Sequence, residues 1–139
     1  MAAEAQGTPG QFWEDLVRNS SADAFCAAFT PTATLETAVT NMPIQGARAI
    51  RVFMLAIAAF YERLRFTSEV RADGVIYLEW DGIAFGEPVA GITTFHHDAA
   101  GGFETIRLQH RRLCTIVRFA RELAKELDGQ FPADLFALD

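Results

Sequence analysis

The most strongly apolar stretch of the chain covers residues 46–64 and has the spacing of a helix. Its large apolar residues recur every three or four positions, which places them on one face of about five helical turns. They are Ile50, Phe53, Met54, Ile57, Phe60 or Tyr61, and Leu64. Apolar residues also occupy much of the opposite side, so such a helix must be covered by other parts of the chain. We therefore predict a long central helix with the rest of the fold wrapped around it.

After this helix the sequence changes to the alternating pattern of β-strands. The first strand ends at Asp73-Gly74, a strong hairpin signal, and further strands are predicted over residues 75–85, 89–97 and 103–113. In the first strand, alternation places four residues on one face: Phe66, Ser68, Val70 and Ala72. Four strands connected by hairpins form an antiparallel meander, and glycines within the strands favour strong curvature.

Shorter elements are expected on both sides of this core. Two short helices precede it, the first capped by Thr8 and the second by Ser21, and a short strand follows over residues 32–40. A helical stripe returns beyond Thr115 and ends at Gly129. The final segment, residues 131–138, is apolar enough to dock in a groove of the same chain or of a partner.

Composition narrows the class of protein. With 139 residues, the chain is predicted to form one domain, with a core over about residues 10–113 and a C-terminal helix and tail over 114–139. Its formal net charge of −6 disfavours nucleic acid as a partner. The two cysteines lack a metal-ligand spacing and are expected to be free thiols. No signal peptide or membrane span is predicted, so we expect a cytoplasmic protein without a membrane partner.

Two passages of the sequence resemble the nuclear transport factor 2-like superfamily. One is Phe29 followed by Thr34-Leu35-Glu36 and then by residues 44–50, and the other is residues 103–110. The resemblance implies an α+β fold, in which a curved antiparallel sheet wraps around a long helix and encloses a cone-shaped cavity. It also implies a homodimer formed through the outer face of the sheet. The superfamily includes ketosteroid isomerase, limonene epoxide hydrolase, scytalone dehydratase, polyketide cyclases and non-catalytic binding domains.

The catalytic groups of two members are largely replaced here. The three positions that carry the base and hydrogen-bond donors in ketosteroid isomerase-like proteins correspond to Thr37, Trp13 and Thr93, which include no acid and no phenol. Of the Asp-Arg-Asp set of limonene epoxide hydrolase-like proteins, only Asp81 is present, with Glu79 and Leu108 at the other positions. Neither mechanism is therefore expected.

A polyketide cyclase-like reaction needs only one acid–base group in the cavity. If Ile106 and Leu108 face inward, alternation places His110 on the same face. Glu79 and Asp81 also share a face, which is either the cavity side or the outer side, and Glu36 precedes the vacated base position. His110, Glu79, Asp81 and Glu36 are thus the candidate acid–base residues, although a surface or hydrogen-bonded role is commoner for a histidine near a strand end.

The predicted ligand is a small apolar molecule, and twelve phenylalanines indicate either a full core or a lined cavity. The pocket is expected to be lined by Trp13, Phe53, Ile57, Tyr61, Trp80, Thr93, Phe95, Ile106 and Leu108. No cofactor or metal is expected, because the adjacent His96 and His97 point to opposite faces of a strand. Three possibilities remain open: a cyclase, isomerase or hydrolase, a non-catalytic binding or dimerisation module, and a cavity closed by residues 131–138.

Overall fold

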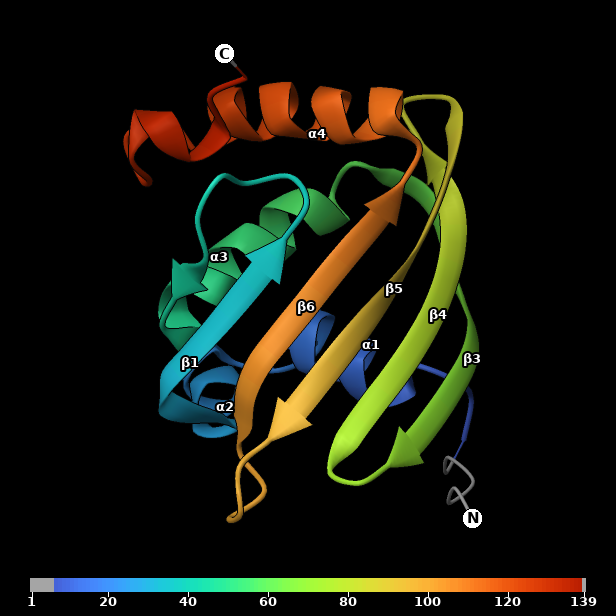
Figure 1. Ribbon diagram of the computed structural model, residues 1–139, viewed down its shortest axis with the longest axis vertical. Helices are drawn as coiled ribbons and strands as arrows, with labels where there is room; N and C mark the ends of the chain where they lie inside the picture. The colour runs from blue at the N-terminus through green and yellow to red at the C-terminus, as the bar shows by residue number, and fades with distance from the viewer. Residues whose placement is uncertain (1–6, 139) are drawn as a thin grey trace.

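A curved six-stranded sheet forms one layer of the molecule, and helices pack on its inner face (Figure 1). The computed structural model describes residues 7–138. The sheet has the order β2-β1-β6-β5-β4-β3. Its strands are β1 (Phe29–Thr37), β2 (Ile44–Gln45), β3 (Tyr61–Ala72), β4 (Val75–Ala84), β5 (Glu87–His97) and β6 (Phe103–Arg111). The helices are α1 (Gln11–Arg18), α2 (Ala22–Ala27), α3 (Ala47–Ala58), α4 (Leu113–Glu126) and the short 3₁₀ helix η1 (Ala133–Phe136).

The antiparallel meander of β3, β4, β5 and β6 confirms the predicted α+β fold. At its end, β1 runs parallel to β6, and the two-residue β2 pairs antiparallel with β1. β1 begins three residues earlier than predicted, because Phe29 already pairs with Phe103. Pro31 lies inside this strand, where the register is irregular and the missing N–H of proline is tolerated.

The central helix is shorter than its apolar pattern predicts. α3 ends at Ala58, and Tyr61 already begins β3 opposite Ala84, so the prediction of a helix over residues 46–64 is wrong in its last part. The helix has about three turns, and it buries Ile50, Phe53 and Met54 together with Ile57. Residues 61–64 have an apolar spacing that suits both structures, and the long ladder with β4 favours the strand.

A bulge in β3 changes which residues face the core. The register shifts between Phe66 and Ser68, so Val70 is exposed whereas the Glu69 side chain is only 2% exposed. The prediction that Phe66 and Val70 share a face is therefore wrong. Glu69 accepts a hydrogen bond from the N–H of Gly10 (2.9 Å) and pairs with Arg71 (2.9 Å). This carboxylate fixes the start of α1.

The N-terminal caps differ between the first two helices. α1 is preceded by Gly10 at φ 75°, so Gly10 and not Thr8 is its N-cap residue. A Cβ at this position would overlap the ring of Phe66. In α2 the Ser21 hydroxyl accepts the N–H of Ala24 (3.1 Å), which confirms the predicted cap.

α4 lies across one end of the sheet and places Phe119 and Leu123 in the core (Figure 1). The tail then returns to the loop after β1, where the Asn41 N–H donates to the Leu135 carbonyl (2.8 Å). Leu135 and Phe136 are buried there, so the tail docks in a groove of its own chain. None of the helices formed by residues 7–138 has the length and apolar character that a membrane-spanning helix needs.

Candidate functional site

A tyrosine and a histidine meet inside the cone, at the end covered by α4. Tyr61 begins β3 and His110 lies near the end of β6, and the phenol oxygen is 3.2 Å from Nε2 of the imidazole. The His110 ring packs between Trp80 and Phe119, with centroid distances of 5.2 and 5.1 Å. The prediction that His110 shares the inner face with Ile106 and Leu108 is confirmed, since all three are buried.

Burial keeps both groups of this pair uncharged near neutral pH. It lowers the pKa of His110 from 6.5 to about 4 and raises the pKa of Tyr61. The phenol and the imidazole thus share one hydrogen bond, in which either Tyr61 donates to Nε2 or Nε2–H donates to the phenol oxygen. His110 Nδ1 has no hydrogen-bond partner among residues 7–138. The pair can donate or accept a hydrogen bond without changing its net charge.

A small apolar recess lies beside Tyr61, between α1, α3 and β3. Its volume is about 50 Å³, and the rim carries Glu14 and Arg18, which form an ion pair of 3.8 Å. The apolar wall consists of Trp13, Val17, Met54, Ile57, Ala58, Leu64 and Phe66. A recess of this size, open at the surface, admits at most one small ring or short chain. Because Tyr61 both lines the recess and contacts His110, it connects the buried pair to the surface.

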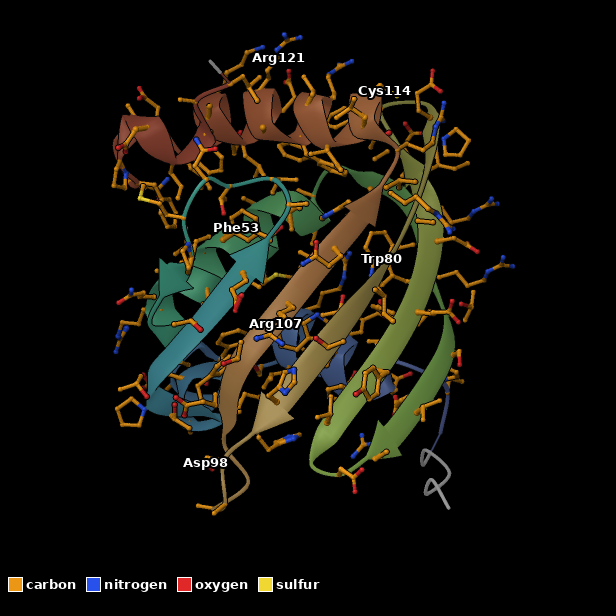
Figure 2. The ribbon with its side chains drawn as sticks, viewed as in Figure 1. Phe53, Trp80, Asp98, Arg107, Cys114 and Arg121 are labelled. Atoms are coloured by element: carbon orange, nitrogen blue, oxygen red, sulfur yellow. The ribbon has the colours of Figure 1, made fainter. Side chains whose placement is uncertain are left out.

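Most residues of the predicted pocket fill the cone and do not line a cavity. Phe53 and Phe95 are fully buried, and the Thr93 hydroxyl accepts a hydrogen bond from Trp80 Nε1 (3.0 Å). Trp80, Ile106 and Leu108 are also buried in the core, and Figure 2 shows Phe53 and Trp80 among the side chains. Of the predicted set, only Trp13, Ile57 and Tyr61 line the recess. Large rings pack against one another here, for example Trp13 on Phe95 at 4.9 Å, and leave little free volume.

The three candidate carboxylates lie on the outer face of the sheet. Trp80 points inward, so its neighbours Glu79 and Asp81 point outward, as one of the two alternatives predicted. Asp81 pairs with Arg65 (3.1 Å), and Glu36 pairs with Arg107 (3.3 Å). The side chains of Glu79, Asp81 and Glu36 therefore do not point into the cone, although Glu79 and Asp81 line an outer hollow whose lining also includes His110.

Sequence reasoning missed seven of the ten residues that line the recess, and also the ring that covers the Tyr61–His110 pair. Met54, Leu64 and Phe66 line the recess, and Phe119 covers the Tyr61–His110 pair from α4. Alternation places Leu64 and Phe66 on one face but Tyr61 on the other, and the register shift between Tyr61 and Arg63 brings all three to the recess. Among the described residues, no group of three His, Cys, Asp or Glu side chains is placed to hold a metal ion.

Several solved structures share this architecture. A steroid delta-isomerase from Pseudomonas aeruginosa superposes with a TM-score of 0.74 at 16% identity, over 84% of this chain and 86% of that one. An uncharacterized protein with a cystatin-like fold from Silicibacter pomeroyi gives a TM-score of 0.77 at 8% identity, over 87% and 85%. An NTF-2 like protein of unknown function from Burkholderia xenovorans gives 0.57 at 10% identity, over 70% and 75%.

Sequence comparison adds no closer relationship. No protein-family model matches the chain, and no curated protein matches it significantly. The structural similarities, together with the meander and the helices on its inner face, agree with the resemblance seen in residues 29–50 and 103–110. The chain therefore has the fold of the nuclear transport factor 2-like superfamily.

Proposed function

We propose that the protein binds a small apolar molecule in the recess between α1, α3 and β3, with the Tyr61–His110 pair as its polar end. The observation that carries this proposal is the position of Tyr61, which lines an apolar recess and contacts a buried, unprotonated histidine. A neutral ligand is favoured, because Trp13, Met54 and Ile57 would desolvate a charge, and the two charged residues at the rim, Glu14 and Arg18, already pair with each other. A ring or short chain with one hydroxyl or carbonyl group suits these walls.

A second candidate function is acid–base catalysis by the same pair. The observation that favours it is the hydrogen bond between Tyr61 and His110, since a neutral imidazole can take a proton and a neutral phenol can donate one. A histidine whose pKa is about 4 is, however, a weak base at neutral pH. The inward positions Trp13 and Thr93 supply neither a carboxylate nor a phenol, so binding without turnover is the better supported of the two.

The binding proposal is tested with 4-fluorophenol, a small ring with one hydroxyl, observed by fluorine NMR. We expect saturable binding that Ala58→Phe abolishes, because Ala58 lines the recess and a ring there fills it. Ala59→Phe is the matched control, since Ala59 is exposed at the next position and outside the recess. Equal affinity of the wild type and Ala58→Phe would exclude the recess as the site.

Tyr61→Phe separates the polar end from the apolar walls. The substitution removes the phenol oxygen and leaves the ring. It should therefore weaken the binding of 4-fluorophenol more than the binding of fluorobenzene. Tyr77→Phe removes a hydroxyl from an exposed ring on the outer face and should change neither affinity. For the catalytic alternative, any turnover found in a substrate screen must disappear in His110→Ala, while ligand binding remains measurable.

We also propose that two chains associate through the outer face of the sheet. Three large apolar side chains that support this are exposed there: Val70, Tyr77 and Ile92. Val70 and Tyr77 are direct partners across β3 and β4, so they form a continuous apolar surface. Analytical ultracentrifugation should show a dimer that dissociates in Tyr77→Lys. A monomeric wild type would contradict the association.

A further inference from the structure

The outer face of the sheet carries charges of opposite sign on the two strands that flank β5. Figure 1 shows this face, with β4, β5 and β6 side by side in front of α1 and α2. On β4 the outward residues include Glu79 and Asp81. On β6 they include Arg107, which pairs with Glu36, and Arg111. Between these strands β5 presents uncharged side chains, namely Ala90, Ile92 and Thr94.

The strand register arranges these residues in three rows across the sheet. Each row has an acidic or aromatic residue on β4, an uncharged residue on β5 and a polar or basic residue on β6. One row contains Asp81, Ala90 and Arg111, the next contains Glu79, Ile92 and Gln109, and the third contains Tyr77, Thr94 and Arg107. Neighbouring strands are about 4.8 Å apart, so the outer members of a row are separated by about 10 Å. The face is therefore acidic on one side of β5 and basic on the other.

Two charges on this face are not neutralised within the described part of the chain. Neither the Glu79 carboxylate nor the Arg111 guanidinium has a hydrogen-bond or ion-pair partner among residues 7–138. Asp81 accepts a hydrogen bond from Arg65 through Oδ2 (3.1 Å), which leaves its Oδ1 able to accept another. A partner with complementary charges would therefore find both an acceptor and a donor here.

The centre of this face is hollowed around Ala90. Two shallow hollows, of about 440 and 400 Å³, meet at this residue, and Asp81 and Arg111 line both of them. Ile92 stands at the edge of the first hollow and is 37% exposed. A flat partner surface would leave the hollows empty, whereas long polar side chains that cross an interface would fill them. The shape therefore suits a partner that presents arginine and carboxylate side chains at the same spacing.

We propose that this partner is a second copy of the chain, packed with β5 over β5 and with the two β5 strands running in the same direction. The inference rests on the association proposed above and specifies its geometry. A twofold axis along β5 exchanges the two sides of the face, so β4 of each copy lies opposite β6 of the other. Asp81 then faces Arg111 of the second copy, and the symmetry forms this pair twice. An axis across the strands would instead place β4 over β4, where the carboxylates repel one another.

This arrangement also covers exposed apolar residues of the face. Ile92 of one copy meets Ile92 of the other on the axis, and Tyr77 lies opposite Arg107, whose guanidinium can stack on its ring. Sheets that pack face to face keep their strands within about 30° of each other, and long side chains bridge that offset over three rows. The interface thus combines an apolar line along β5 with ion pairs on both sides of it.

The test exchanges the two charges and measures dimerisation by analytical ultracentrifugation at low salt. Asp81→Arg places like charges opposite each other at both pairs, and Arg111→Asp does the same with the opposite sign. Each variant alone should therefore dimerise about tenfold more weakly than the wild type, or weaker still. In an equimolar mixture both pairs become attractive again, and dimers should form with nearly the wild-type dissociation constant. The double variant Asp81→Arg/Arg111→Asp should likewise dimerise by itself.

Asp23→Arg and Arg48→Asp are the matched controls, because they make the same changes of charge at exposed positions of α2 and α3, behind the sheet. They should leave the dissociation constant unchanged. A monomeric wild type would overturn the association itself and this geometry with it. A wild-type dimer that neither exchange weakens, or folded variants that stay monomeric when mixed, would overturn the geometry alone. If circular dichroism shows either variant to be unfolded, Asp81→Lys and Arg111→Glu repeat the exchange.

Discussion

His110 makes the stability of the fold depend on pH. In the unfolded chain its imidazole binds a proton below a pH of 6.5, whereas in the folded protein burial lowers the pKa to about 4. Between these values the unfolded state binds more protons, so stability falls as the pH is lowered through this window and is fully present above it. Because Tyr61 stays a neutral phenol, it offers the imidazolium no compensating charge.

This gives the first prediction, which concerns one residue. Lowering the pH from 7 to 5 should reduce the His110 contribution to the free energy of unfolding by about 2 kcal/mol. Urea unfolding at the two pH values measures it, and His110→Phe should remove this part of the pH dependence. His96→Gln is the control, because His96 lies on the outer face beside Arg107. A His110→Phe variant with the full pH dependence of the wild type would contradict the assignment.

At the same scale, the sequence predicted the face of the strand on which His110 lies, but not the residue that it contacts. Ile106, Leu108 and His110 alternate without interruption to the end of β6, so one inward residue fixed the other two. Tyr61 is 49 positions away along the chain, and its contact with His110 depends on the curvature of the four strands from β3 to β6. Alternation also left the faces of Glu79 and Asp81 open, and only the packing of Trp80 decided between them.

At the scale of elements, the sequence pattern did not predict where helices end or where strands bulge. An apolar spacing of three and four continued through Leu64, although the backbone from Tyr61 onward pairs with β4. The bulge after Phe66 leaves no signal in the alternation, yet it turns Glu69 inward to bind the start of α1. The type of each element could be predicted because long segments of the chain keep one period. The residues at which an element begins and ends could not, because they depend on contacts between distant strands.

The junction of α1 and β3 gives the second prediction. Gly10→Ala should destabilise the protein by about 2 kcal/mol or more, because the new Cβ overlaps Phe66 and alanine disfavours the positive φ of 75°. Gly101→Ala is the matched control: Gly101 has a φ of 90°, and its Cβ would meet no atom within 4 Å. Urea unfolding should show the larger loss for Gly10→Ala. Equal losses would mean that the contact with Phe66 contributes nothing.

At the scale of the whole molecule, α4 closes the cone that the sheet and α3 leave open. Phe119 contacts Tyr61 and His110 from this helix, with centroid distances of 5.5 and 5.1 Å. The tail that follows packs on the loop at Asn41, so the helix and not the tail covers the pair. The composition left a full core and a lined cavity as alternatives, and the rings fill the cone except for the recess at Tyr61.

The third prediction follows from this closure. Phe119→Ala should admit water to the imidazole, raise the pKa of His110 from about 4 toward its ordinary value, and destabilise the fold by about 3–5 kcal/mol. Leu123→Ala also removes a fully buried side chain from α4 but not the ring packed on His110, so it should destabilise the fold without the same rise in pKa. Titration of the histidine signals by NMR measures the pKa. A His110 pKa that is unchanged in Phe119→Ala would show that α4 does not exclude water from the pair.

The most direct test of the proposed site is nitrogen NMR of the His110 imidazole during a titration with 4-fluorophenol. At pH 7 we predict the nitrogen shifts of a neutral ring, and a saturable change in the His110 signal with the same midpoint as the fluorine signal of the ligand. His96 and His97, on the exposed side of the sheet and at its end, serve as internal references and should not respond. A His110 ring that is protonated at pH 7, or whose signals do not change while the ligand binds, would contradict the proposal that the Tyr61–His110 pair forms the polar end of the binding site.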